Sequence, residues 1–467
     1  MKTTKRRFEQ FLFYDYTGIK AHLEKMAMKG WQIHKIKRFY WEYCKKEPQK
    51  LTYAVSYFSE ASEFNPYPTD NQQTFHEYCK GAGWQLVAEQ AQMQIFCSEQ
   101  ANPTPIETEE SVKLKAIHRS MKKNFLPSSM LMLLLSLFQI VLQFSTIMRS
   151  PVSSLVNVTT LPLIVIWNII TINMLTNLIG YAVWYYRSKK AISTGGTCIE
   201  SSSGYKKVYY FMWILLGIAL ALTVFMMSSQ QFGWVGGLGI IDVSVTIVLV
   251  LAIKNTLKGT GVSRRINLTV TIISCAILSF ALTGAMAWGI VRGVNAGWFD
   301  NKPNETYTIT QPDGSTYTWD IYHNPLPLKV EDLQSVDYNH YSYEWTASET
   351  VLLGHFVGWQ KPFPDGQHAP ELRYEIVEVK LAVLFDICLN DYLDKYDYDW
   401  DEPEDFKSYF QITDDPAWQA DAVYQLYYQG EGMNEYILCW GNRIVNISFE
   451  EIPTTEQITI VVEKLGK

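Results

Sequence analysis

The chain has 467 residues, a net charge of −7 and 48% hydrophobic residues. Its charge is unevenly divided, because basic minus acidic side chains give +5 over residues 1–123, +8 over residues 124–291 and −20 over residues 292–467. The middle block has only two acidic side chains, Glu200 and Asp242, which excludes one continuous soluble domain. We therefore predict a multi-domain membrane protein, with a membrane-spanning segment between two polar domains.

Residues 1–110 are predicted to form a cytoplasmic α+β domain that is an internal duplication. Each half has the order strand, helix, strand, strand, and the first strands are expected at FEQFLFYDY and LTYAVSYF. Gly30-Trp31 and Gly83-Trp84 recur 53 residues apart, and each Gly permits the left-handed conformation that ends a helix. Two such units side by side would form one antiparallel sheet with both helices on one face.

A groove between the two halves is a candidate ligand site. The aromatic residues that could line it are Trp31, Trp41, Tyr43, Tyr53 and Trp84. The alternative is that these rings form the core and cross-strand pairs, as strand aromatics commonly do.

Residues 111–125 are predicted to form a basic juxtamembrane helix, which either lies on an anionic lipid surface or simply flanks the first span. Five apolar runs reach the length of about 20 residues that crosses a bilayer. They lie within residues 126–291, near 126–148, 161–186, 208–228, 234–253 and 267–291. Lys and Arg gather before the first run and after the second and fourth, so we expect a cytoplasmic N-terminus and an extracytoplasmic C-terminus.

Polar residues inside these runs are few. Asp242 lies in the fourth run, and Asn173 and Asn177 lie in the second. A carboxylate is costly in a bilayer unless it is paired, protonated or hydrated, so Asp242 is a functional candidate. The alternative is a structural role, in which it accepts hydrogen bonds from Asn or Gln on neighbouring helices.

Residues 292–467 are predicted to form a small, acidic, extracytoplasmic α+β domain. We expect a hairpin in QPDGSTYTW, strands at TVLLGHFVGW and LRYEIVEV, and a helix over residues 380–395. A second hairpin is expected around Gly441-Asn442. A closing helix should begin at Thr454, where Gln457 completes a capping box.

Two features of this domain bear on chemistry. Asp397, Asp399 and Asp401 supply oxygen atoms at alternating positions, which would suit Ca²⁺. The alternative is a solvated acidic loop. Cys388 and Cys439 either form a disulfide or are two small buried residues. We find no catalytic motif and expect no enzyme activity, no cofactor other than this candidate Ca²⁺, and no direct nucleic-acid binding.

The stretches FYDYTGIKAHLEKMAMKGW, YAVSYFSEASEFNPYPT and YCKGAGWQLVAEQAQMQIF closely resemble the bacterial domain-of-unknown-function family 2812. Longer members resemble the rest of the chain in YSYEW, YEIVEVK and YILCWGNRIVNISF. The resemblance implies a bacterial cell-membrane protein whose gene often neighbours a small PadR-type transcriptional regulator, so a cytoplasmic regulator is a candidate partner. It implies no activity and no catalytic residues.

These observations lead to two hypotheses. The first is a membrane sensor or regulatory protein, in which an extracytoplasmic domain is linked to a cytoplasmic domain that binds a ligand or partner. The second is a transporter, or an accessory subunit of one, that uses Asp242 within the membrane.

Overall fold

The structure is a computed structural model of the chain. It describes all residues except 1–3, 10, 38–39, 101, 201–202, 229–232, 299–301, 311–312, 365–368, 397–406 and 467, together with the side chains of 203–207, 209, 227–228, 233–236 and 240. The chain divides into two compact units. Unit 1 comprises Met1–Ile140 and Val165–Gly293, and unit 2 comprises Val141–Ile164 and Val294–Lys467.

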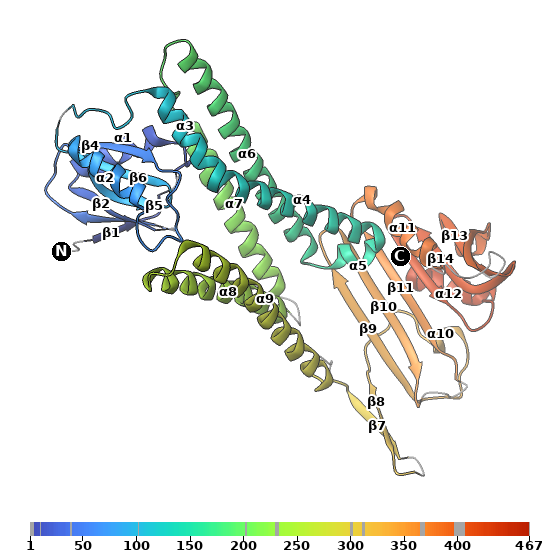
Figure 1. Cartoon of the computed structure of the whole chain (residues 1–467). Helices are drawn as coiled ribbons and strands as arrows, with labels where there is room; N and C mark the ends of the chain where they lie inside the picture. The colour runs from blue at the N-terminus through green and yellow to red at the C-terminus, as the bar shows by residue number, and fades with distance from the viewer. Residues whose placement is uncertain are drawn as a thin grey trace. The chain divides into compact units, whose positions relative to one another are not determined.

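The N-terminal domain, in unit 1, contains two copies of the predicted strand, helix, strand, strand order (Figure 1). The first copy consists of β1 (Thr4–Arg7), α1 (Tyr16–Met28), β2 (Trp31–Ile36) and β3 (Trp41–Lys45). The second consists of β4 (Thr52–Tyr57), α2 (Asp70–Gly81), β5 (Gln85–Gln90) and β6 (Met93–Ser98). Each copy forms its own antiparallel sheet, in the orders β1-β3-β2 and β4-β6-β5.

The duplication extends to fine backbone detail. Gly30 and Gly83 both have positive φ, at 74° and 84°. The register of β2 shifts between Ile33 and Lys35, and the register of β5 shifts between Leu86 and Ala88. These shifts are also 53 residues apart, so the two halves share a bulge as well as a strand order.

The structure corrects two sequence-based expectations for this domain. First, there are two three-stranded sheets in place of one, because the second sheet is covered on both faces. Tyr53 and Ile95 face a core shared with α1, whereas Phe96 packs with Trp84 and Cys79 beside α2. The two helices therefore do not lie on one face of a single sheet.

Second, the described residues of FEQFLFYDY do not form a strand. The first strand lies earlier, at Thr4–Arg7, and the chain turns before α1. The rings of Phe11 and Tyr14 pack into the core, and the Asp15 carboxylate caps α1 by accepting a hydrogen bond from Gly18 N at 3.0 Å. Aromatic composition alone suggested a strand, but the cap requires the chain to turn.

The middle of the chain is helical. Its elements are α3 (Glu110–Ser120), the π-helical turn η1 (Met121–Phe125), α4 (Leu126–Arg149), α5 (Pro151–Val156), α6 (Thr160–Ser193), α7 (Ser203–Ser228), α8 (Gly233–Gly259) and α9 (Arg264–Asn295). Within the described residues, four helices are long and apolar enough to cross a membrane: Glu110–Arg149, Thr160–Ser193, Gly237–Gly259 and Arg264–Asn295. Helix α7 has a shorter described apolar stretch, Tyr210–Met226.

The C-terminal domain, in unit 2, is built on a seven-stranded antiparallel sheet in the order β12-β13-β14-β15-β11-β10-β9. Its strands are β9 (Tyr341–Glu349), β10 (Leu353–Pro362), β11 (Leu372–Val379), β12 (Ser408–Ile412), β13 (Ala422–Tyr428), β14 (Glu431–Trp440) and β15 (Arg443–Ser448). The other elements are the hairpin β7 (Glu305–Thr310) and β8 (Thr316–Ile321), the helices α10 (Val330–Leu333), α11 (Phe385–Leu393) and α12 (Thr455–Leu465), and the short turns η2 (Ala382–Leu384), η3 (Asp394–Tyr396) and η5 (Pro416–Trp418).

Several predicted elements of this domain are confirmed. The β7–β8 hairpin turns at Gly314 (φ 86°), and β14 and β15 turn at Gly441 (φ 57°). Strands β10 and β11 are the two predicted alternating runs. Helix α12 begins after Thr454, and the capping box with Gln457 is formed. Strands β9, β12 and β13 were not predicted from the residue pattern.

The two faces of the large sheet bury different helices. Ile376 and Val445 belong to a core shared with α12, whereas the neighbouring residues Val377 and Ile444 belong to a core shared with α11 and α5. Helix α5, which connects α4 to α6, thus lies against this sheet in unit 2 (Figure 1).

Candidate functional site

An open cavity of about 820 Å³ lies in unit 1, within the size range of small-molecule sites. Its walls come from β2 and β5, the equivalent strands of the two repeats, from the loop before α2, and from the end of α8. The lining residues include His34, Lys35, Lys37, Tyr40, Ser62, Glu63, Asn65, Tyr67, Gln72, Glu89, Gln90, Lys254, Asn255 and Lys258. A cavity between the two halves therefore exists, as the duplication suggested.

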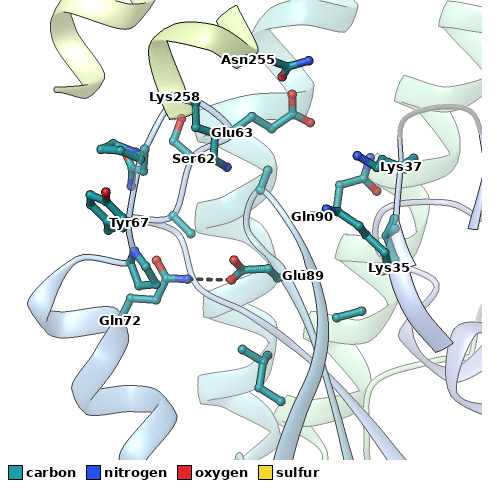
Figure 2. A pocket seen from close by; sticks show the side chains of 18 of the residues that line it. Lys35, Lys37, Ser62, Glu63, Tyr67, Gln72, Glu89, Gln90, Asn255 and Lys258 are labelled. Carbon is teal, nitrogen blue, oxygen red and sulfur yellow. Dashed lines mark hydrogen bonds between the residues drawn. The ribbon is translucent and has the colours of Figure 1, made fainter. Parts of the chain in front are cut away.

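Lysines dominate the charge of this cavity. Figure 2 shows Lys35 and Lys37 on one wall and Lys258 on another. None of these three pairs with a carboxylate among the described residues. The bulge in β2 exposes His34 and Lys35 together, and the nearby Lys35 ammonium lowers the pKa of Lys37. A bound anion would relieve this repulsion between like charges.

The two carboxylates of the cavity already have partners. Glu63 forms an ion pair with Lys254 at 3.0 Å, and Lys254 also lies over the ring of Phe64. Glu89 accepts a hydrogen bond from the buried amide of Gln72 at 3.1 Å. With both carboxylates engaged, the remaining lysines give the open part of the cavity a positive character.

A buried asparagine fixes the wall between the loop and the helices. Asn267, at the start of α9, is fully buried, and its Nδ2 donates to the carbonyls of Phe64 at 3.4 Å and Lys254 at 3.3 Å. Its Oδ1 accepts from Thr271 Oγ1 at 3.2 Å. One side chain thus joins the loop before α2 to both α8 and α9.

The cavity presents groups that can bind an anion. Ammonium groups on two walls, a Tyr ring and amide side chains can recognise phosphate or carboxylate groups. In the described part of the chain, no group of three His, Cys, Asp or Glu side chains is placed to hold a metal ion. The Nδ2 of Asn65, at the cavity wall, is buried without a hydrogen-bond partner among the described residues.

The aromatic residues predicted to line a groove lie elsewhere. Trp41, Tyr43, Tyr53 and Trp84 are at most 5% exposed and belong to hydrophobic cores. Trp31 is partly buried beneath the Lys5 ammonium, which lies 5.4 Å from the ring. These rings pack within the domain, and none of the five lines the cavity.

The polar residues predicted to lie within the membrane are on two helices, with Asp242 on α8 and Asn173 and Asn177 on α6. Asp242 Oδ2 accepts a hydrogen bond from Thr283 Oγ1 of α9 at 3.2 Å, whereas its Oδ1 is buried with no partner in the described structure. Asn177 donates to Asn173 O and Oδ1, both at 2.9 Å, along α6. The structural alternative expected a donor on a neighbouring helix, and the donor found is Thr283 rather than an Asn or Gln.

The remaining predicted sites lie in the C-terminal domain. Asp397, Asp399 and Asp401 lie outside the described residues. Cys388 and Cys439 are both buried in the core beside α11, and the structure has them as free thiols rather than as a disulfide. Burial raises the pKa of Cys388 to about 11 and that of Cys439 to about 12.

The sequence analysis did not identify the cavity lysines or Asn267 as parts of a site. The sequence did hold a signal, because Lys35 and Lys37 flank Ile36 at the end of β2, and Lys254 and Lys258 have the i, i+4 spacing of one helix face. What the sequence did not reveal is that these two pairs come together.

Comparison with known proteins adds one finding. The family model described as "Protein of unknown function (DUF2812)" matches residues 15–129, which cover the duplicated domain from α1 onward, α3, η1 and the start of α4. No curated protein and no solved structure matches the chain. The N-terminal part of this chain therefore belongs to the DUF2812 family, whereas the match does not address the rest of the chain.

Proposed function

We propose that the chain is a multi-pass membrane sensor or regulatory protein that links an extracytoplasmic C-terminal domain to a cytoplasmic N-terminal domain. In this proposal α7 is the fifth span, together with the four longer apolar helices. The basic loops lie beside the N-terminal domain, which favours a cytoplasmic position for it. The large acidic domain would then face the outside.

The observation that carries the proposal is that α4 and α6, connected by α5, are anchored in both folded domains. In unit 1, the buried ring of Tyr14 packs against Trp184 of α6 at 4.9 Å and against Tyr181 at 5.5 Å. Just after α6, Cys198 N donates to the carboxylate of Glu110, at the start of α3, at 2.9 Å. The N-terminal domain thus shares its core with the ends of these helices.

In unit 2, the short helix between α4 and α6 is part of the core of the C-terminal domain. Val152 and Leu155 are each 5% exposed. Val152 N donates to Asp391 Oδ2 at 3.0 Å, and Thr350 Oγ1 donates to the carbonyl of Leu155 at 3.0 Å. A change in the packing of this domain would therefore act directly on the connection between α4 and α6.

Such a chain can regulate if its helices have two arrangements and both domains favour one over the other. The outer domain would sense a condition or ligand. The lysine-lined cavity would bind an anionic small molecule from the cytoplasm. The cytoplasmic domain would also present its state to a soluble partner, for which a transcriptional regulator remains the candidate.

Hydrogen exchange of the full chain in lipid nanodiscs tests the coupling. Leu155→Ala removes a buried side chain of α5, and Ser153→Ala, at an exposed position of the same helix, is the matched control. We expect faster exchange at the amide of Cys198 in the first variant but not in the second. Exchange changes confined to α5 and the outer sheet would refute the proposed link.

Membrane topology has a separate test. In a chain whose exposed Cys275 is replaced, a cysteine is introduced at Ser315, in the β7–β8 turn, or at Thr194, after α6. Intact cells are then treated with a membrane-impermeant maleimide. We expect labelling of the Ser315→Cys variant alone. Labelling of the Thr194→Cys variant from outside would overturn the orientation.

A transporter role is the second candidate, because Asp242 has one carboxylate oxygen buried without a partner among the described residues. An ion or substrate group could occupy that position. If Asp242→Asn left uptake in cells and every growth phenotype unchanged, this candidate would be abandoned.

A further inference from the structure

A second cavity, of about 560 Å³, lies where α3 and η1 run beside the end of α6. Its charged lining consists of Lys115, Arg119, Lys122 and Lys123 from α3 and η1, and Lys189 from α6. No acidic residue lines it, and none of these five cations forms an ion pair within the described structure. Five unpaired positive charges around one groove repel one another unless an anion is bound.

The floor of this groove is formed by side chains that pack closely on one another. Leu114 is buried, and the ring of Tyr185 stacks on His118 with 4.1 Å between centroids. His118 Nδ1 lies 2.6 Å from the hydroxyl of Tyr181. The groove is therefore a built cleft between two helices, with a polar rim and an apolar base.

The surroundings suit a lipid better than a small soluble anion. Immediately beyond the groove, α4 and α6 expose apolar side chains, among them Met130, Leu131 and Leu134 on α4 and Ile179 and Val183 on α6. An acyl chain could lie along these side chains while its headgroup phosphate meets the lysines. The aromatic side chains Trp184, Tyr185 and Tyr186 are typical of this headgroup level.

We propose that the groove between α3–η1 and the end of α6 binds the phosphate of an anionic phospholipid headgroup. The site is separate from the cavity between the two repeats and does not depend on the sensor function. It contains a π-helical turn, a feature that is frequent at functional sites. A bound phosphate would hold α3 against α6, at the same junction where Tyr14 meets Trp184.

Native mass spectrometry of the full chain in detergent tests this proposal, with phosphatidylglycerol as the probe. Phosphatidylcholine with the same acyl chains is the neutral comparison, and sodium phosphate is the free-anion competitor. The variant is Lys122→Gln/Lys123→Gln. Its matched control is Arg264→Gln/Arg265→Gln, which removes two exposed charges at the start of α9, outside the groove. A second variant, Lys115→Gln/Lys189→Gln, removes one charge from each wall.

We expect tighter binding of phosphatidylglycerol than of phosphatidylcholine to the wild type and the control. Each groove variant should lose about 25-fold in phosphatidylglycerol affinity, roughly 5-fold for each lysine, with phosphatidylcholine binding unchanged. Unchanged phosphatidylcholine binding also shows that the variants are folded. Equal phosphatidylglycerol affinity in variants and control would overturn the proposal, and so would full displacement of the lipid by millimolar phosphate.

Discussion

Asn267 gives the sharpest test of how the N-terminal domain is held to α8 and α9. Asn267→Ala removes three hydrogen bonds: the two that its Nδ2 donates, of 3.4 and 3.3 Å, and the one that its Oδ1 accepts from Thr271 Oγ1, of 3.2 Å. It leaves the carbonyls of Phe64 and Lys254 without this partner. Because the site is fully buried, the loss should be roughly 1–3 kcal/mol. That corresponds to a roughly 5- to 150-fold larger population of the undocked loop.

Hydrogen exchange measures this population at two amides of the loop, Ala61 N, which donates to Phe58 O, and Asn65 N, which donates to Ser62 O. Asn255→Ala, an exposed position on the same cavity wall, is the control and should leave both rates unchanged. Asn267→Asp should be at least as damaging, since a carboxylate would face two carbonyl oxygens. If Asn267→Ala changed neither amide rate, the docking role of this side chain would be refuted.

Three further predictions concern the cavity between the repeats, the seven-stranded sheet of the C-terminal domain, and the turn at Gly30 after α1. Lys35→Gln/Lys37→Gln should weaken binding of polyphosphate anions, measured by calorimetry on the full chain, whereas Lys20→Gln, on an exposed face of α1, should not. A hydrogen bond with His355, the largest cause, lowers the pKa of Glu375 from 4.5 to about 2, so its carboxylate contributes about 3 kcal/mol of stability at neutral pH. This contribution is present above about pH 4.5 and is lost as the pH falls to about 2. Chemical denaturation should therefore show that the Glu375→Gln variant is less stable than the wild type at pH 6 and equally stable near pH 2. Gly30→Ala places a Cβ 2.7 Å from Lys46 O at positive φ and should lower the melting temperature, whereas Gly81→Ala, with no atom within 4 Å of its Cβ, should not.

Local signals in the sequence were sufficient for much of the fold. Gly314 and Gly441 marked two hairpins, Thr454 with Gln457 marked a helix start, and the 53-residue repeat marked the duplication. Each of these depends on interactions within a few residues, where turn and cap chemistry decides the conformation.

The failures share a different cause. FEQFLFYDY was expected to be a strand because it is aromatic, but Asp15 at its end caps a helix, and the rings pack into a core that is formed by distant elements. Trp41 and Tyr43 were candidates for a groove because alternation shows which residues share a face, but not which face is covered. In this domain α1 covers that face.

The candidate cavity was harder to predict than the fold, because its parts are far apart in the chain. Lys35 and Lys258 are separated by more than 200 residues. They come to one site because the loop before α2 docks on α8 and α9 through Asn267 and the Glu63–Lys254 ion pair. The sequence indicated a site between the halves through the duplication, but its polarity followed from strand bulges and helix ends that no local pattern specifies.

The two anchors of α4 and α6 limit how strongly one domain can influence the other. The coupling free energy between the domains cannot exceed the free energy that holds the helices in the more weakly bound domain. A larger coupling would separate the helices from that domain instead of changing its conformation. In the C-terminal domain the anchor includes the buried side chain of Leu155, and truncation of a buried Leu typically costs about 2–5 kcal/mol. Typical regulatory couplings of about 1–3 kcal/mol fall below this value. On the proposed function, the α5 contact is therefore strong enough to carry a coupling of this size, and Leu155→Ala should weaken it.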